Sequence, residues 1–274
     1  MHQNFYQFDF ELPNQGETDK LIAMLSAQGF DGFEEDGDTL IAFVPELQFD
    51  KAAFEKVLEN FSILSYARSD IENINWNSKW EAEFEPVLVD KFVAIRAHFH
   101  RPITTVQHEI IITPKMSFGT GHHSTTYLMM QQMQLLDFTG KTVFDFGTGT
   151  GVLAILSEKL GASTVFAIDN DEWSITNTIE NIEQNNCRLV TVMQMDSIPQ
   201  GKQYDIILAN INLNVITASL SSLASIARQG SDILFSGFLT ENEPAIKAGI
   251  ESAGFQQLST VKRGEWIAVR AKKR

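Results

Sequence analysis

The stretch DFGTGTG, residues 145–151, decides the fold of this chain. It follows residues 142–144 (TVF), which fit a β-strand, and it precedes Leu153, Leu156 and Leu160, which follow at helical spacing. Glycine lets the backbone turn tightly and approach a ligand closely, and the helix behind such a turn offers free N–H groups at its N-terminus. The stretch therefore predicts a strand, a ligand-binding turn and a helix in succession.

The spacing of the glycines narrows the class of ligand. Gly147, Gly149 and Gly151 form the pattern G-x-G-x-G after an acidic residue, Asp145, whereas the dinucleotide fingerprint is G-x-G-x-x-G. The form found here suits a cofactor without a pyrophosphate, whose amino-acid end Asp145 can reach directly or through water. The alternative is that these glycines make only a tight turn.

A second acidic residue, Asp169, ends the next expected strand. An acid at that position is placed to accept hydrogen bonds from both hydroxyl groups of a ribose, which several cofactors share, NAD included. The alternative is that Asp169 caps the following helix, although Asp171 is better placed to do so. Asp196, after the third strand, fits a plain loop residue as well as a cofactor contact, and it is left out of the candidate site.

From residue 123 onward, strand patterns alternate with helical ones, which is typical of a parallel sheet with helices on both faces. We therefore expect a doubly wound α/β domain. Strands are expected at residues 142–146, 165–168, 189–193, 204–209 and 233–235, and an antiparallel hairpin at 255–261 and 266–269. One helical stripe is formed by Ile216, Leu220, Leu223 and Ala227.

The first 73 residues contain a different arrangement of short elements. Residues 5–12 alternate aromatic and polar side chains, as a half-buried strand does, and Asp50 can cap a later helix. The order βαββαβ resembles a ferredoxin-like α+β domain. We therefore expect a small domain over residues 1–73, a linker over 74–85 that carries Trp76 and Trp80, and the larger domain over 86–274.

Composition argues against several classes of partner. The net charge of −14 repels phosphate, which argues against direct binding of nucleic acid and favours a basic protein or an amine. No apolar run approaches the length of a membrane span, and no signal peptide is evident. The single cysteine, Cys187, is compatible with a reducing cytoplasm, and there is no cysteine cluster to hold a metal. The histidine pairs, His98 with His100 and His122 with His123, have no third ligand placed with them, so no metal site is expected.

Two further motifs carry a family resemblance. They are FGTGHHSTT at residues 118–126 and ANIN at residues 209–212. Together with the glycine turn they resemble the PrmA family, the methyltransferases of ribosomal large-subunit protein eleven. Residues 147–171, the SGFL segment at 236–239 and the tryptophan-containing linker match the same family, while the N-terminal part matches in architecture and size and less closely in sequence.

The resemblance implies a class I methyltransferase fold (Rossmann-like) with S-adenosylmethionine as cofactor. It further implies that the cofactor contacts Thr126, Gly147, Asp169 and Asn210. The pattern of the glycine turn indicates Asp145 and Gly149 as further cofactor contacts. Asn210 is also the candidate catalytic residue, because its side-chain carbonyl can accept a hydrogen bond from an incoming amine. Family members often have leucine in place of Asn212, which leaves the role of Asn212 open.

By the same resemblance, the substrate is ribosomal large-subunit protein eleven, methylated on lysine side chains or its N-terminal amine, and the N-terminal domain recognises it. Three alternatives stay open. One is a methyltransferase of another protein or a small amine, although the extra domain favours a macromolecule. Another is an NAD-type oxidoreductase, which the glycine spacing disfavours. The third is a non-enzymatic interaction protein, against which the intact cofactor motifs argue. The oligomeric state is not indicated.

Overall fold

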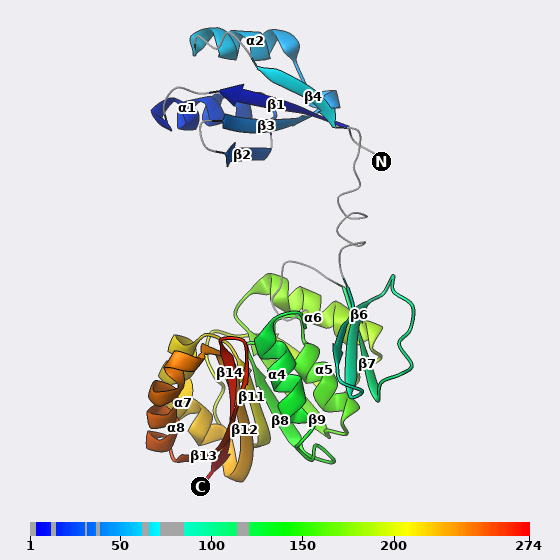
Figure 1. Cartoon of the computed structure of the whole chain (residues 1–274), viewed down its shortest axis with the longest axis vertical. Coiled ribbons are helices and arrows are strands. Elements are labelled where there is room, and N and C mark those ends of the chain that lie inside the picture. Colours follow the sequence, from blue (N-terminus) through cyan, green and yellow to red (C-terminus); the bar gives the residue numbers. More distant parts are fainter. Residues whose placement is uncertain are drawn as a thin grey trace. The chain divides into compact units, whose positions relative to one another are not determined.

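The computed structural model describes residues 4–11, 15–30, 32–36, 39–61, 66–71, 85–113 and 121–274. The chain divides into two compact units, Met1–Phe84 and Glu85–Arg274 (Figure 1). The linker expected at 74–85, with Trp76 and Trp80, lies outside the described residues apart from Glu85. Residues 118–120 of the FGTG motif also lie outside them.

The first unit is a four-stranded antiparallel sheet with the strand order β2-β3-β1-β4. This order, with a helix after β1 and another after β3, is that of a ferredoxin-like domain. Its elements are β1 (Phe5–Glu11), α1 (Gln15–Ser26), β2 (Gly32–Asp36), β3 (Thr39–Pro45), η1 (Glu46–Gln48), α2 (Lys51–Asn60) and β4 (Ala67–Ile71).

An aromatic core holds the first unit together. Phe8 and Phe10 alternate on β1 and therefore point to one face of the sheet, where they pack with Leu21 of α1 and Phe54 of α2. The helix α2 begins where expected, because the Asp50 carboxylate accepts hydrogen bonds from the N–H groups of its first turn. Both helices thus cover the same face of the sheet.

The second unit contains a seven-stranded sheet in the order β10-β9-β8-β11-β12-β14-β13 and a small sheet in the order β5-β6-β7. The strands from β10 to β12 run parallel, and β14 and β13 close the sheet as the expected antiparallel hairpin. The strands are β5 (Val87–Val89), β6 (Val93–Ala97), β7 (His108–Ile112), β8 (Thr142–Phe146), β9 (Thr164–Asp169), β10 (Val190–Gln194), β11 (Tyr204–Asn210), β12 (Ala227–Leu239), β13 (Phe255–Arg263) and β14 (Trp266–Lys273).

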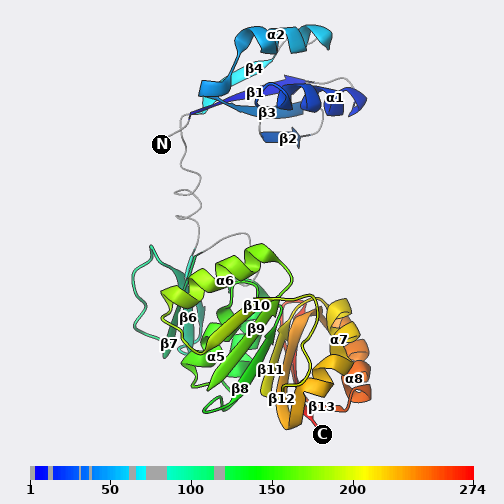
Figure 2. The ribbon, with the colours of Figure 1, turned by 180° about the vertical axis from the view of Figure 1, so that it is seen from behind.

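Helices cover both faces of the large sheet (Figures 1 and 2). Phe144 and Phe235 point to the face covered by α7 and α8, where a continuous apolar core forms. The helices α4 and α5 pack on the sheet as well, α4 against β12 and β14 and α5 against β8 and β9. The helices are α4 (Ser124–Met133), α5 (Val152–Lys159), α6 (Glu172–Gln184), α7 (Leu213–Ile226) and α8 (Glu243–Ser252), with a 3₁₀ turn, η2 (Thr240–Asn242), before α8.

The expected boundary between α7 and β12 was wrong. Ala227 was placed on the apolar stripe of α7, but the helix ends at Ile226 and the backbone of Ala227 is already extended as the first residue of β12. Ile226, three residues after Leu223, is the last buried residue of the helix, and Ala227 is buried as part of the strand. The strand β12 also extends beyond residues 233–235 at both ends, and near its start Ala227 pairs with Tyr204 of β11 and Asp232 pairs with Ile206.

Candidate active site

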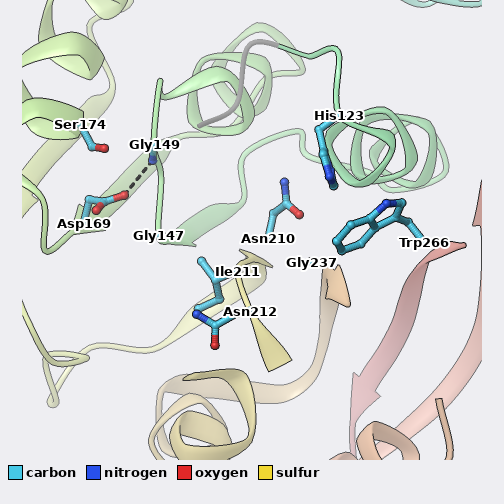
Figure 3. Close-up of a pocket in the computed structure, with 10 residues that line it drawn as sticks. All are labelled: His123, Gly147, Gly149, Asp169, Ser174, Asn210, Ile211, Asn212, Gly237 and Trp266. Atoms are coloured by element: carbon cyan, nitrogen blue, oxygen red, sulfur yellow. Dashed lines mark hydrogen bonds between the residues drawn. The ribbon is translucent and has the colours of Figure 1, made fainter. Parts of the chain in front are cut away.

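A cavity of about 370 Å³ opens at the carboxyl ends of the parallel strands. The strands β9 and β10 follow β8 on one side of it, and the next strand in the sequence, β11, lies on the other side of β8. The strand order therefore reverses between β8 and β11. Open α/β sheets bind ligands at such a reversal. The cavity is lined by His123, Gly147, Gly149, Asp169, Ser174, Asn210, Ile211, Asn212, Gly237 and Trp266 (Figure 3).

The glycine turn after β8 has the backbone that only glycine adopts readily. Gly147, Gly149 and Gly151 have φ angles of +74°, +57° and +80°. A Cβ atom on Gly147 would also lie 2.2 Å from the Cγ2 atom of Ile211. The glycines are therefore needed for the shape of the turn and for the close approach of the segment after β11.

Asp169 ties the end of β9 to the glycine turn. One of its carboxylate oxygens accepts a hydrogen bond from the N–H of Gly149 at 2.9 Å, and the other accepts from the N–H of Asp171 at 3.1 Å. Asp171 caps α6 through the N–H of Ser174, as expected. Each carboxylate oxygen can accept a second hydrogen bond, so Asp169 can still receive hydroxyl donors from the cavity.

Asn210 ends β11 with half of its amide engaged. Its Nδ2 atom donates to the hydroxyl of Thr126 on α4 at 3.3 Å. Its Oδ1 atom is buried, and no described residue donates a hydrogen bond to it. Most buried polar atoms in proteins are paired, so an unpaired carbonyl on a cavity wall indicates a place for a ligand's N–H group.

Asp145 lies beneath the turn, and neither it nor Thr126 is among the described residues that line the cavity. Its carboxyl group accepts a hydrogen bond from the Thr148 hydroxyl at 2.7 Å. Burial, together with the smaller effect of the nearby charge of Asp169, raises the pKa of Asp145 to about 7, although the hydrogen bond from Thr148 acts in the opposite direction. The structure thus brings Gly147, Gly149, Asp169 and Asn210 together on the wall and places Asp145 and Thr126 behind it.

Two aromatic residues of the cavity were not expected from the sequence. His123 precedes α4 and caps it, because its Nδ1 atom accepts from the N–H of Thr125 at 3.3 Å. Since a backbone N–H can only donate, the neutral ring carries its hydrogen on Nε2. Trp266, the first residue of β14, packs edge-on against the ring with centroids 4.5 Å apart, and burial lowers the pKa of His123.

Gly237 was noted in the SGFL motif but not as a site residue. Its φ is +100°, and a Cβ atom there would lie 2.1 Å from the carbonyl oxygen of Ile211. Ile211 therefore packs closely between Gly147 and Gly237, and this packing is possible because neither residue has a side chain. Asn212, the departure from the family pattern, caps α7 by accepting from the N–H of Val215 at 3.0 Å.

Within the described ranges, no three His, Cys, Asp or Glu side chains converge in a way that could hold a metal ion. The same ranges contain no helix that is long and apolar enough to cross a membrane. Cys187 follows α6, where burial raises the pKa of its thiol to about 11, so at neutral pH the sulfur stays in the less nucleophilic thiol form.

Comparison with known proteins gives a consistent result over nearly the whole chain. Residues 15–274 match the family model described as "Ribosomal protein L11 methyltransferase (PrmA)". A ribosomal protein L11 methyltransferase of Bacteroides fragilis is 34% identical over 97% of this chain and 98% of that protein. One from Porphyromonas gingivalis is 39% identical over 95% of this chain and 92% of its own length.

Solved structures show the same likeness. The ribosomal protein L11 methylase of Lactobacillus delbrueckii subsp. bulgaricus superposes with a TM-score of 0.65 at 27% identity, over 70% of this chain and all of that one. A methyltransferase from Pyrococcus furiosus has a TM-score of 0.51 at 17% identity, over 60% of this chain and 88% of that one, and shares the fold.

Proposed function

The chain belongs to the ribosomal protein L11 methyltransferase (PrmA) family, and on that premise we propose that it transfers methyl groups from S-adenosylmethionine to amino groups of ribosomal protein L11. The acceptors are lysine side chains, the N-terminal α-amine, or both. The observation that carries the proposal is the unpaired Oδ1 atom of Asn210, which lies on the same cavity wall as the glycine turn and Asp169.

The residues present fit S-adenosylmethionine. In Figure 3, Asp169, Ser174 and Gly149 lie on one side of the cavity, and Asn210, His123 and Trp266 lie on the other. The carboxylate of Asp169 would accept from the ribose hydroxyls, and Gly147 and Gly149 let the backbone approach the donor closely. Thr126 and Asp145 would support this wall from behind, Thr126 through Asn210 and Asp145 through Thr148.

The acceptor amine would lie at the Asn210 side of the cavity. When bound, S-adenosylmethionine supplies a sulfonium methyl group that a neutral amine can attack in line. The Asn210 carbonyl would accept an N–H hydrogen of that amine and so orient its lone pair. His123 and Trp266 would flank the carbon chain that carries the amine and exclude water from it.

The protein must also favour the neutral form of the amine. A free lysine has a pKa of about 10.4 and is almost fully protonated at neutral pH. Burial against Trp266 and the neutral ring of His123 would lower that pKa, because desolvation disfavours the charged form. Asn210 adds no charge, so its carbonyl can hold the amine without stabilising the ammonium as a carboxylate would.

The family and the charge of the chain support the proposed partner and location. We assign recognition of ribosomal protein L11 to the ferredoxin-like unit and catalysis to the second unit. The net charge of −14 favours a basic protein and argues against direct contact with nucleic acid. The substrate class and the single Cys187 favour a cytoplasmic location.

A competition experiment tests the substrate. The purified protein is incubated with radiolabelled S-adenosylmethionine and equal amounts of ribosomal protein L11, an unrelated basic protein and free lysine. The proposal expects label in ribosomal protein L11 alone. Label in the other protein or in lysine would replace the substrate, and binding of NAD in place of S-adenosylmethionine would overturn the reaction class as well.

A further inference from the structure

Two buried side chains of α6 hold consecutive carbonyl groups of the glycine turn. The Thr178 hydroxyl donates to the carbonyl oxygen of Gly149 at 2.6 Å, and Nδ2 of Asn181 donates to the carbonyl oxygen of Thr150 at 2.8 Å. Both side chains are fully buried. Residues three apart lie on the same face of a helix, so one turn of α6 engages both groups. The two carbonyl groups therefore point toward α6.

Asn181 also binds a segment from the small sheet. Its Oδ1 atom accepts from the backbone N–H of Thr113, just after β7, at 2.7 Å. Asn177, one turn earlier on α6, donates to the carbonyl oxygen of the same Thr113 at 3.0 Å. One buried amide thus joins the glycine turn to the segment that follows β7.

Asn185, one turn further along α6, provides an internal contrast. Its amide pairs with both backbone groups of Ile111, accepting from the N–H at 3.0 Å and donating to the carbonyl at 2.6 Å. It also donates to the carbonyl oxygen of Asn181. None of these hydrogen bonds within the described residues reaches the glycine turn, so Asn185 anchors β7 to the end of α6 and does not contact the turn.

We propose that Thr178 and Asn181 are positioning residues for donor binding, acting through the glycine turn. A buried carbonyl without a donor is unfavourable, so the turn keeps its left-handed glycine conformations only while both partners are present. Loss of either partner lets the turn relax and moves Gly149 away from Asp169, to which its N–H donates. This inference rests on the proposed function, because it takes the glycine turn as the site of S-adenosylmethionine.

The test measures the dissociation constant of S-adenosylmethionine by titration calorimetry for wild type and four variants. Thr178→Val keeps the shape of the side chain and removes only the hydroxyl, while Thr178→Ser keeps the hydroxyl. We expect Thr178→Val and Asn181→Ala to raise the dissociation constant by about fivefold to tenfold. We expect Thr178→Ser and the matched control Asn185→Ala to stay within about twofold of wild type.

Amide hydrogen exchange in the protein without ligand gives a second readout. We expect the amides of residues 149–151 to exchange faster in Asn181→Ala and Thr178→Val than in Asn185→Ala. Wild-type affinity in both turn variants, or an equal loss in Asn185→Ala, overturns the inference, as does equal exchange at residues 149–151. If wild type fails to bind S-adenosylmethionine, the proposed function fails, and hydrogen exchange still decides whether α6 holds the turn.

Discussion

Asn210 and Thr126 meet behind the cavity, where the Nδ2 atom of Asn210 donates to the Thr126 hydroxyl at 3.3 Å. They lie 84 positions apart in the sequence, one at the end of β11 and one on α4. This hydrogen bond fixes which end of the amide faces the protein. The carbonyl end is left without a described partner and is available to a substrate amine.

We predict that Asn210→Ala lowers kcat for methyl transfer by at least about tenfold and leaves the free energy of unfolding within about 1 kcal/mol of wild type. The fold loses one hydrogen bond, from the Asn210 amide to the Thr126 hydroxyl, and loses nothing at the oxygen, which has no described partner, whereas the reaction loses its acceptor. Initial rates at saturating substrates and urea denaturation measure the two quantities.

Asn212→Ala is the control for this prediction. Because Asn212 caps α7, its loss should lower the free energy of unfolding by about 1 kcal/mol and leave kcat within about threefold of wild type. A wild-type kcat in Asn210→Ala would contradict the catalytic role of Asn210. A loss of stability in Asn210→Ala together with a loss of activity in Asn212→Ala would reverse the roles given to the two asparagines.

Asp169→Asn should weaken binding of the donor more than it slows the reaction. The substitution removes the charge that strengthens hydrogen bonds from ribose hydroxyls, so we expect the dissociation constant of S-adenosylmethionine to rise by about tenfold to a hundredfold. Calorimetry measures the affinity, and kcat at saturating donor should fall by much less. An unchanged affinity would show that Asp169 serves only the backbone of Gly149 and Asp171.

Gly237→Ala should destabilise the protein strongly. The new Cβ atom would meet the carbonyl oxygen of Ile211, in a backbone with φ of +100°, and we expect a loss of more than about 3 kcal/mol in the free energy of unfolding. Gly264→Ala is the matched control, since Gly264 also has a positive φ and meets nothing within 4 Å, so about 1 kcal/mol is expected. Equal losses in urea denaturation would contradict the steric account.

Asp145 should make the free energy of unfolding fall as pH rises, which is the opposite of the usual effect of a carboxyl group in a folded protein. Burial raises the pKa of its carboxyl group to about 7, above the value of 3.8 in an unfolded chain. Between these values the folded protein binds more protons than the unfolded one, so the free energy of unfolding should fall as pH rises from about 4 to 7. Asp145→Asn should remove this slope in urea denaturation series. An identical slope in the variant would assign the dependence to other groups.

Local patterns predicted much of the second unit. The strand at Thr142–Phe146 and the cap at Asp171 were expected from the sequence and are confirmed. Each depends on neighbours within a few residues, on alternation of apolar side chains or on an acid before a helix. The same reasoning placed Asn210 at the carboxyl end of a parallel strand, because strand ends in such sheets face one edge.

Contacts between distant segments were not predictable in this way. Trp266 reaches the cavity only because β14 pairs with β12, and His123 only because α4 packs against the same strands. The sequence also cannot show on which side of a turn an acid lies, and the structure buries Asp145 beneath the turn. The need for glycine at position 237 likewise depends on a backbone crossing by Ile211.

The most direct test of the account locates the methyl groups and the site together. Ribosomal protein L11 is incubated with either wild type, Asn210→Ala or Asp169→Asn at a concentration of S-adenosylmethionine near the dissociation constant of the wild type, and the products are mapped by mass spectrometry. The account predicts methylated lysine side chains or a methylated N-terminus with wild type, and strongly reduced methylation with both variants. Methylation at the wild-type rate by both variants, or none by a wild-type protein that binds S-adenosylmethionine, would contradict it.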